Sequence, residues 1–201
     1  MEKDISIVII EDNETLKSGG LIWELEDIYK AVHFFVKPDD GLKFIKDNLK
    51  ELFIILLDIS FPANEKNGHK ILEEIRELSK NIPVILWSGI NEYDETFSDF
   101  INNGANAYLK KDATTEEALK IINNVTITLK MSIDKAIEEW IEIQEKDERM
   151  KPYLITAKNG KTYTLNQILE EIRKQTPFGM EFAKDLNMLT IDLLLRGKKQ
   201  F

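Results

Sequence analysis

Side chains that could do chemistry together follow four separate apolar segments of this 201-residue chain. Glu11-Asp12, Asp58 and Ser88 each come at the end of such a segment, and Lys110-Lys111 end a fourth. Three converging carboxylates would repel one another and need a cation nearby. Oxygen ligands without histidine or cysteine suit a hard ion such as Mg²⁺. A carboxylate beside Mg²⁺, an ammonium and a hydroxyl could act as a nucleophile toward a phosphoryl group.

The elements that must position these residues alternate between strands and helices over the first 112 residues. β-Branched and apolar runs predict strands, and amphipathic segments between them predict helices. This alternation predicts a doubly wound, five-stranded parallel sheet covered by helices on both faces, with ligands at the carboxyl ends of its strands. The expected strands are 5–10, 31–36, 53–57, 83–87 and 107–109, and the expected helices are 13–29, 38–49, 71–78 and 94–102.

The rest of the chain has a different pattern. Thr114-x-x-Glu117 matches a capping box, and an apolar stripe at helical spacing then continues to Ile141. Lys158-Asn159-Gly160 between two β-prone runs predicts a hairpin, and two amphipathic helices follow it. We therefore expect a sheet domain over 1–130, a helical connector over 131–151 and a small α+β unit over 152–201.

Composition and charge exclude several classes of function. The chain has no cysteine and two histidines, so disulfides, thiol catalysis and cysteine–zinc sites are absent. Its longest apolar run has six residues, and there is no signal-peptide pattern, so we expect a cytoplasmic protein with no membrane contact. Residues 1–130 hold 15 basic against 24 acidic residues, and residues 131–201 hold 12 of each. Neither part has the basic surface typical of nucleic-acid binding.

The chemistry-bearing residues resemble those of the receiver domain of two-component response regulators. The resemblance covers about residues 4–130 and rests on five elements in order. They are Glu11-Asp12, Asp58 before Ile59-Ser60-Phe61-Pro62, Ser88-Gly89, Tyr108 after Gly104-Ala105-Asn106-Ala107, and Lys110-Lys111-Asp112. The spacing also agrees, with Asp58 30 residues before Ser88 and 53 before Lys111. Such a domain has a flavodoxin-like fold and is a phosphoacceptor in signalling, not an enzyme acting on a separate substrate.

The resemblance implies a role for each acidic residue. Asp58 would accept a phosphoryl group from a histidine kinase or a phosphotransfer protein. Glu11, Asp12 and Asp58 would hold Mg²⁺, together with the backbone carbonyl of Ser60. Phe61 departs from the residue usual before Pro62, and the 62–68 loop is longer than the family's common form.

The resemblance also assigns the remaining site residues. Ser88 would bind a phosphoryl oxygen, and Tyr108 would be the aromatic residue that changes position with it. The family's lysine falls three residues after that aromatic, which selects Lys111 over Lys110. Adjacent strand residues face opposite sides, so only one of the two lysines can reach the site. Asp112 replaces the proline that is more common after the lysine.

The C-terminal unit decides the output, and no output family is apparent from its residues. Residues 164–195 hold three basic residues against five acidic ones, which argues against binding to duplex DNA. We therefore expect this unit to bind another protein, with a second copy of the chain as an alternative occupant. A transcription regulator with an atypical DNA-binding end is the alternative function. An enzyme of the haloacid dehalogenase class is disfavoured, because Ser60 stands where its second aspartate would be.

Overall fold

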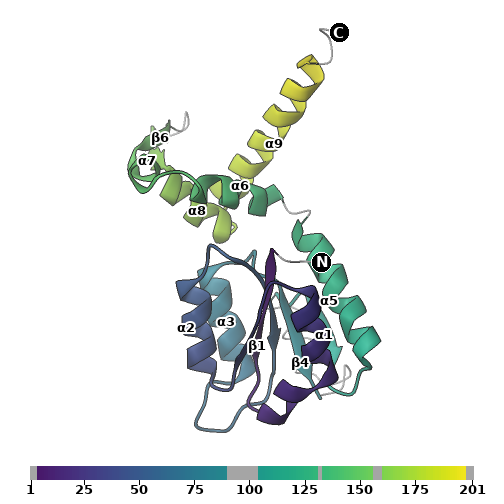
Figure 1. Ribbon diagram of the computed structural model, residues 1–201. Helices are drawn as coiled ribbons and strands as arrows, with labels where there is room; N and C mark the ends of the chain where they lie inside the picture. The colour runs from purple at the N-terminus through teal and green to yellow at the C-terminus, as the bar shows by residue number, and fades with distance from the viewer. Residues whose placement is uncertain (1–3, 90–103, 131–132, 156–159, 198–201) are drawn as a thin grey trace. The chain divides into compact units, whose positions relative to one another are not determined.

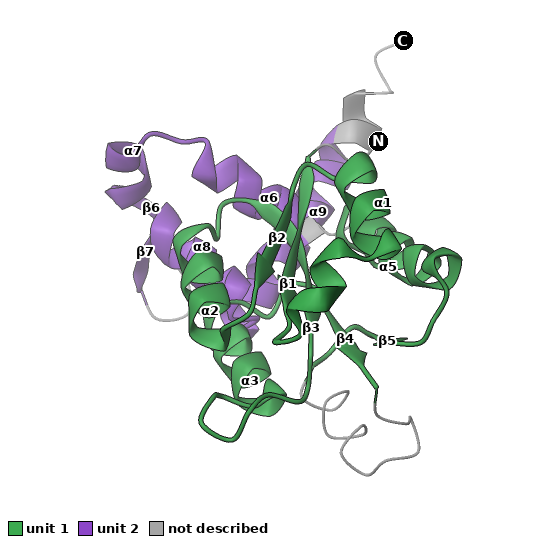
Figure 2. Cartoon of the chain, turned by 60° about the horizontal axis from the view of Figure 1, so that its bottom comes forward, with its two compact units in different colours: residues 1–130 green, residues 131–201 purple. Residues whose placement is uncertain are grey.

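The structure, a computed structural model, describes residues 4–89, 104–130, 133–155 and 160–197. The chain forms two compact units, Met1–Lys130 and Met131–Phe201, which are considered separately (Figure 2). The helix expected over 94–102 lies outside the described residues.

The first unit contains a five-stranded sheet in which every neighbouring pair is parallel (Figure 1). The strand order is β2-β1-β3-β4-β5. This is the predicted five-stranded parallel sheet, and it brings the carboxyl ends of all five strands to one edge. The strands are β1 (Ile5–Ile10), β2 (Val32–Phe35), β3 (Leu52–Leu57), β4 (Val84–Ser88) and β5 (Ala107–Lys110).

Helices cover both faces of this sheet. Side chains of α1 and α5 pack on one face, and those of α2 and α3 pack on the other (Figure 1). The sequence pattern explains this double cover, because the strands are apolar on both sides and each side needs a partner layer. The helices are α1 (Gly20–Ile28), α2 (Pro38–Asp47), α3 (Gly68–Leu78) and α5 (Thr115–Lys130).

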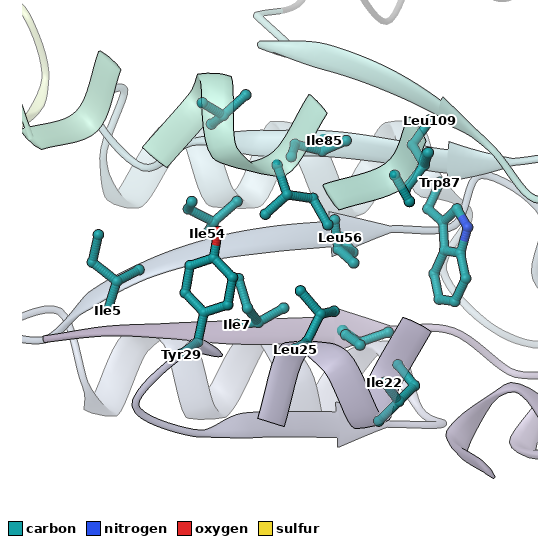
Figure 3. Close-up of a cluster of buried hydrophobic side chains, with 14 of the residues drawn as sticks. Ile5, Ile7, Ile22, Leu25, Tyr29, Ile54, Leu56, Ile85, Trp87 and Leu109 are labelled. Carbon is teal, nitrogen blue, oxygen red and sulfur yellow. The ribbon is translucent and has the colours of Figure 1, made fainter. Parts of the chain in front are cut away.

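The central strand β1 shows how the two cores divide. Ile7 and Ile9 belong to the cluster under α1 and α5, whereas Val8 and Ile10 belong to the cluster under α2 and α3. Figure 3 shows the first cluster, where Leu25 of α1 lies near residues of the central strands. Since both faces of β1 are fully buried, the end of this strand is held firmly in place.

The first helical segment begins differently from the simplest expectation. Asn13 caps a 3₁₀ turn, η1 (Glu14–Ser18), by accepting a hydrogen bond from the Thr15 N–H at 3.1 Å. The α-helix α1 starts only at Gly20, after an extended Gly19. The glycine pair that weakens a continuous helix over 13–29 therefore marks the point where the helix begins.

The second unit is built from helices and a short hairpin. Its core joins Ile137 and Ile141 of α6, Tyr163 of β7 and the apolar face of α8. The sequence set 131–151 apart as a connector, but α6 packs against α8 and is part of this unit. The elements are α6 (Ile133–Glu142), α7 (Lys146–Met150), β6 (Pro152–Ile155), β7 (Thr162–Thr164), α8 (Leu165–Arg173) and α9 (Pro177–Gly197).

Local signals fix the boundaries in this unit. Thr164 and Gln167 form a reciprocal capping box at the start of α8. Gly179 lets α9 approach α8 closely, because a Cβ there would lie 2.3 Å from the Glu171 carbonyl oxygen. β6 and β7 pair antiparallel, as the Asn159-Gly160 signal predicts.

Among the described residues, no helix is both long and apolar enough to cross a bilayer.

Candidate functional site

Backbone hydrogen bonds place the chemistry-bearing residues at one edge of the sheet. The Asp58 N–H donates to the Ile10 carbonyl at 2.9 Å, which fixes the end of β3 beside the end of β1. The Lys111 N–H donates to the Ser88 carbonyl at 3.1 Å, which fixes the end of β5 beside the end of β4. The side chains that follow these strands therefore start from a rigid frame.

Three carboxylates converge at this edge. One ligand atom from each of Glu11, Asp12 and Asp58 lies within 4.8 Å of the others. Glu11 and Asp58 are buried, and Asp12 is the more exposed of the three. The structure thus brings together the predicted acidic set, with two members inside the protein and one on the rim.

Lys111 is the cation that faces this cluster. Its Nζ lies 2.8 Å from Glu11 Oε2 and 3.0 Å from Asp58 Oδ2. Lys110 is exposed, in agreement with the alternation of side chains along β5. One ammonium therefore serves two buried carboxylates, and negative charge remains in excess.

The burial of these charges shifts their protonation. Burial raises the pKa of Glu11, and the neighbouring charge of Asp58 adds to the effect; Lys111 and the Asn13 N–H oppose it without cancelling it. For Lys111, burial alone would lower the pKa, but hydrogen bonds to Glu11 and Asp58 outweigh it and raise the pKa. The site thus favours the charged form of Lys111 and, relative to an ordinary glutamate, the protonated form of Glu11.

The oxygen atoms of this site fit a hard cation. Glu11 Oε1 accepts the Asn13 N–H at 3.0 Å, and Asp58 Oδ1 accepts the Ile59 N–H at 2.7 Å. The second oxygen of Glu11, Oε2, is buried and faces Lys111 Nζ at 2.8 Å. Buried carboxylate oxygens that share one ammonium, beside the more exposed carboxylate of Asp12, form the kind of all-oxygen donor set that suits Mg²⁺.

The other predicted site residues lie around the acidic cluster. Ser88 is buried at the end of β4. The Tyr108 hydroxyl donates to the Ser88 carbonyl at 3.2 Å, and the ring is half-buried against the cluster under α2 and α3. These contacts link the predicted aromatic residue to the predicted hydroxyl residue through the backbone. Ser60 lies in the exposed loop after Asp58, and its carbonyl stays a prediction as a ligand.

The long loop beside Asp58 is tied down at its far end. Lys66 Nζ lies 2.7 Å from Asp39 Oδ1 of α2 and 3.0 Å from Glu74 Oε2 of α3. Gly68 then allows close backbone contact, since a Cβ there would lie 2.8 Å from the Asp58 carbonyl oxygen. The lengthened loop is thus fastened to both helices that flank it.

Sequence reasoning missed Arg76, which anchors the approach to β5. Its guanidinium donates to the Gly104 carbonyl at 2.7 Å, to the Ile82 carbonyl at 2.7 Å and to Asn106 Oδ1 at 3.2 Å. Burial lowers the pKa of Arg76 to about 10. A lone arginine on a helix carries no sequence signal for such partners, because two of them are backbone carbonyls.

A comparison with protein-family models matches residues 7–123 to the response regulator receiver domain. This chain belongs to the response regulator receiver family. The match spans more than half of the chain and all of the site residues assigned above. It shows that the receiver resemblance seen in the sequence is correct.

Known proteins and solved structures agree with this family. The transcriptional regulatory protein CiaR of Streptococcus pneumoniae is 30% identical over 113 residues, covering 56% of this chain and 47% of CiaR. The nitrate/nitrite response regulator protein NarL of Escherichia coli is 27% identical over 124 residues, covering 61% and 55%. This chain thus matches about half the length of these relatives. A receiver domain from Clostridium thermocellum has the same fold, with a TM-score of 0.56 and 24% identity over 63% of this chain and 98% of that one.

Proposed function

We propose that this protein is a response regulator that is phosphorylated on Asp58 in a Mg²⁺-dependent reaction and then changes how its C-terminal unit binds another protein. A histidine kinase or a phosphotransfer protein would supply the phosphoryl group. The observation that carries the proposal is the buried Asp58 carboxylate, 3.0 Å from Lys111 and within 4.8 Å of two further carboxylates.

The chemistry follows from the contacts of this carboxylate. An Asp58 oxygen forms a bond to phosphorus as the bond from phosphorus to the donor's histidine nitrogen breaks, and that nitrogen keeps the electron pair. Lys111 lies where it can neutralise an oxygen of the transferred group, and Ser88 lies at the next strand end to bind another. A bound Mg²⁺, held by Glu11, Asp12 and Asp58, would supply further positive charge to the phosphoryl oxygens.

The same contacts suggest how the signal leaves the site. An acyl phosphate on Asp58 would add negative charge beside Lys111 and would accept hydrogen bonds from the groups around it. Ser88 and Tyr108 are linked through the Ser88 carbonyl, so a movement of the Ser88 backbone changes the hydrogen bond that holds the tyrosine. The surface around Tyr108 would then differ between the phosphorylated and the unphosphorylated form.

The test is phosphorylation by acetyl phosphate, with and without Mg²⁺, followed by intact-mass measurement. Wild type should gain one phosphoryl group only when Mg²⁺ is present, and Asp58→Asn should gain none. Asp112→Asn is the matched control, because it changes an exposed aspartate close to the same strand end. Labelling of Asp58→Asn, or no labelling of wild type, would reject the site.

The contacts of the C-terminal unit support a protein partner over DNA. Arg173, one of the few basic residues of its helical part, is occupied by Glu138 at 3.2 Å and Glu142 at 2.6 Å. Lys174 pairs with Glu170 at 2.6 Å. Two of the three basic residues between 164 and 195 are therefore matched by acids within their own unit.

A transcription regulator is the second candidate, and the similarity to CiaR, which is a transcriptional regulatory protein, favours it. The two functions differ in their response to duplex DNA. The full chain, with and without a beryllofluoride mimic of the phosphoryl group, should not shift duplex DNA in a gel at moderate salt. A salt-dependent shift that increases with the mimic would favour the DNA-binding function.

A further inference from the structure

The loop from residue 59 to residue 67 begins directly after Asp58, and hydrogen bonds close its base. Asp58 Oδ1 accepts the Ile59 N–H at 2.7 Å, and the Ile59 carbonyl accepts the Gly68 N–H at 3.0 Å. A Cβ at position 68 would lie 2.7 Å from Ile59 Cα, so a larger residue would force the two backbone segments apart. The first residue of the loop is therefore held by both of its backbone polar groups.

Ser60, whose carbonyl is the predicted Mg²⁺ ligand, comes next in this loop. Its side chain is exposed, so the backbone on either side sets the direction of its carbonyl. On the far side, Phe61 packs against the core cluster under α2 and α3. The chain then crosses exposed and half-buried positions from 62 to 67 before α3 begins. Surface loops of this kind sample several conformations unless side chains hold them.

Lys66 is a side chain that holds the far part of the loop. Its Nζ contacts Asp39 in the first turn of α2 at 2.7 Å and Glu74 of α3 at 3.0 Å. These two helices pack side by side on one face of the sheet (Figure 1). Hydrogen bonds to both carboxylates raise the pKa of Lys66, so the ammonium stays charged throughout the neutral range. One side chain therefore fastens the loop to two helices of the receiver core.

We propose that Lys66 is a positioning residue for the metal site: by fastening the loop to α2 and α3, it holds the Ser60 carbonyl where Mg²⁺ binds. The proposal rests on the Mg²⁺ site of the function proposed above and adds to it a residue of the lengthened loop. Without this anchor, the loop presents the carbonyl correctly in only a fraction of its conformations. The apparent dissociation constant for Mg²⁺ then rises in inverse proportion to that fraction.

The expected size of the effect follows from the exposure of the ion pairs. The Lys66 side chain is 35% exposed and that of Asp39 is 70% exposed, so each contact is partly screened by solvent. We therefore expect loss of the anchor to raise the dissociation constant for Mg²⁺ about three- to fivefold.

Replacement of Lys66 by methionine separates positioning from simple electrostatics, because the two have opposite effects on Mg²⁺. Loss of a positive charge near the acidic cluster would by itself strengthen the attraction for the ion. Loss of the anchor weakens binding instead. Lys66→Met should therefore bind Mg²⁺ about three- to fivefold more weakly than wild type in titration calorimetry of the full chain.

Lys70→Met is the matched control for this measurement. Lys70 is exposed and pairs with Glu73 of the same helix, so its replacement removes a charge without releasing the loop. The dissociation constant for Mg²⁺ should stay equal to that of wild type or fall. An increase equal to that of Lys66→Met would overturn the positioning role.

Two further measurements distinguish positioning from a general disturbance of the structure. Lys66→Arg keeps a cation of similar reach and should restore Mg²⁺ affinity to within about twofold of wild type. Acetyl phosphate should label Lys66→Met more slowly than wild type at limiting Mg²⁺ and at the same rate at saturating Mg²⁺. No rescue by arginine, or a slower rate at saturating Mg²⁺, would overturn the proposal.

Failure of this inference differs from failure of the proposed function. If wild type binds Mg²⁺ and Lys66→Met binds it equally or more tightly, the metal site stands and Lys66 has no positioning role. If wild type neither binds Mg²⁺ nor gains a phosphoryl group, the proposed function fails, and the role of Lys66 fails with it.

Discussion

Removal of the single ammonium in the receiver site should destabilise the metal-free protein strongly. Lys111 lies 2.8 Å and 3.0 Å from two buried carboxylates. With an effective dielectric constant of about 20, each contact gives a gross attraction of ~6 kcal/mol. Most of this offsets the desolvation of the three charges, but breaking a buried pair by removing one partner costs about 3–5 kcal/mol. Because the Lys111 side chain is 27% exposed, we expect the lower end for Lys111→Met, about 3 kcal/mol.

The assay must report on the receiver unit alone. Trp87 lies in the receiver core, so the background variant carries Trp23→Phe and Trp140→Phe and leaves Trp87 as the only fluorophore of its kind. Urea unfolding in the presence of a chelator then gives the free energy of unfolding. Lys110→Met, which removes an exposed neighbouring charge, is the control and should change stability by less than about 0.5 kcal/mol.

A double-mutant cycle identifies the cause. Asp58→Asn should recover at least about 1 kcal/mol in the Lys111→Met background, because it removes one of the two unpaired carboxylates. Mg²⁺ should stabilise Lys111→Met as well as wild type, since the ion supplies the missing positive charge. A loss below about 1 kcal/mol for Lys111→Met, or no coupling to Asp58, would refute the view that this lysine balances buried charge.

Three further changes test other parts of the structure. Gly68→Ala should cost about 1–3 kcal/mol and slow phosphorylation by acetyl phosphate, because its Cβ would lie 2.8 Å from the Asp58 carbonyl oxygen; unchanged labelling would contradict this. Arg173→Met should destabilise the C-terminal unit by about 1.5–3 kcal/mol in urea unfolding followed by Trp140, because it removes the guanidinium from buried Glu138 and leaves Lys135 as the cation beside it; a neutral result would contradict it. The raised pKa of Glu11 means that the metal-free folded protein binds a proton there more tightly than the unfolded chain does. The free energy of unfolding should therefore increase as pH falls through that raised pKa. Mg²⁺ must displace this proton, so the affinity for Mg²⁺, measured by calorimetry, should decrease as pH falls over the same range; a pH-independent affinity would contradict this.

The sequence could predict the receiver site because the information for it is local. Glu11, Asp58 and Ser88 each end an apolar run, and parallel strands bring such ends together whatever else the chain does. The same reasoning could not supply the groups that hold these side chains in place. The Ile59 N–H that binds Asp58 is a backbone group, which any residue offers. Its role depends on the turn that the loop adopts.

The second unit shows where sequence reasoning ends. Ile137 and Ile141 form an apolar face that predicts burial, but helical spacing does not say against what. The uninterrupted pattern after Thr115 therefore suggested a connector, whereas α6 contributes both residues to the core of the C-terminal unit. The polar pairing of Arg173 with Glu138 spans 35 residues, and no periodicity links residues at that distance.

The two units handle buried charge in opposite ways, and this difference indicates what each can bind. In the receiver, buried Glu11 and Asp58 share one ammonium, so negative charge remains in excess at this site. In the C-terminal unit, buried Glu138 contacts both Arg173 at 3.2 Å and Lys135 at 3.3 Å, so its charge is already balanced. A group that changes the charge at the edge of the sheet should therefore act on the receiver, whereas the ion pairs of Glu138 hold the C-terminal unit together.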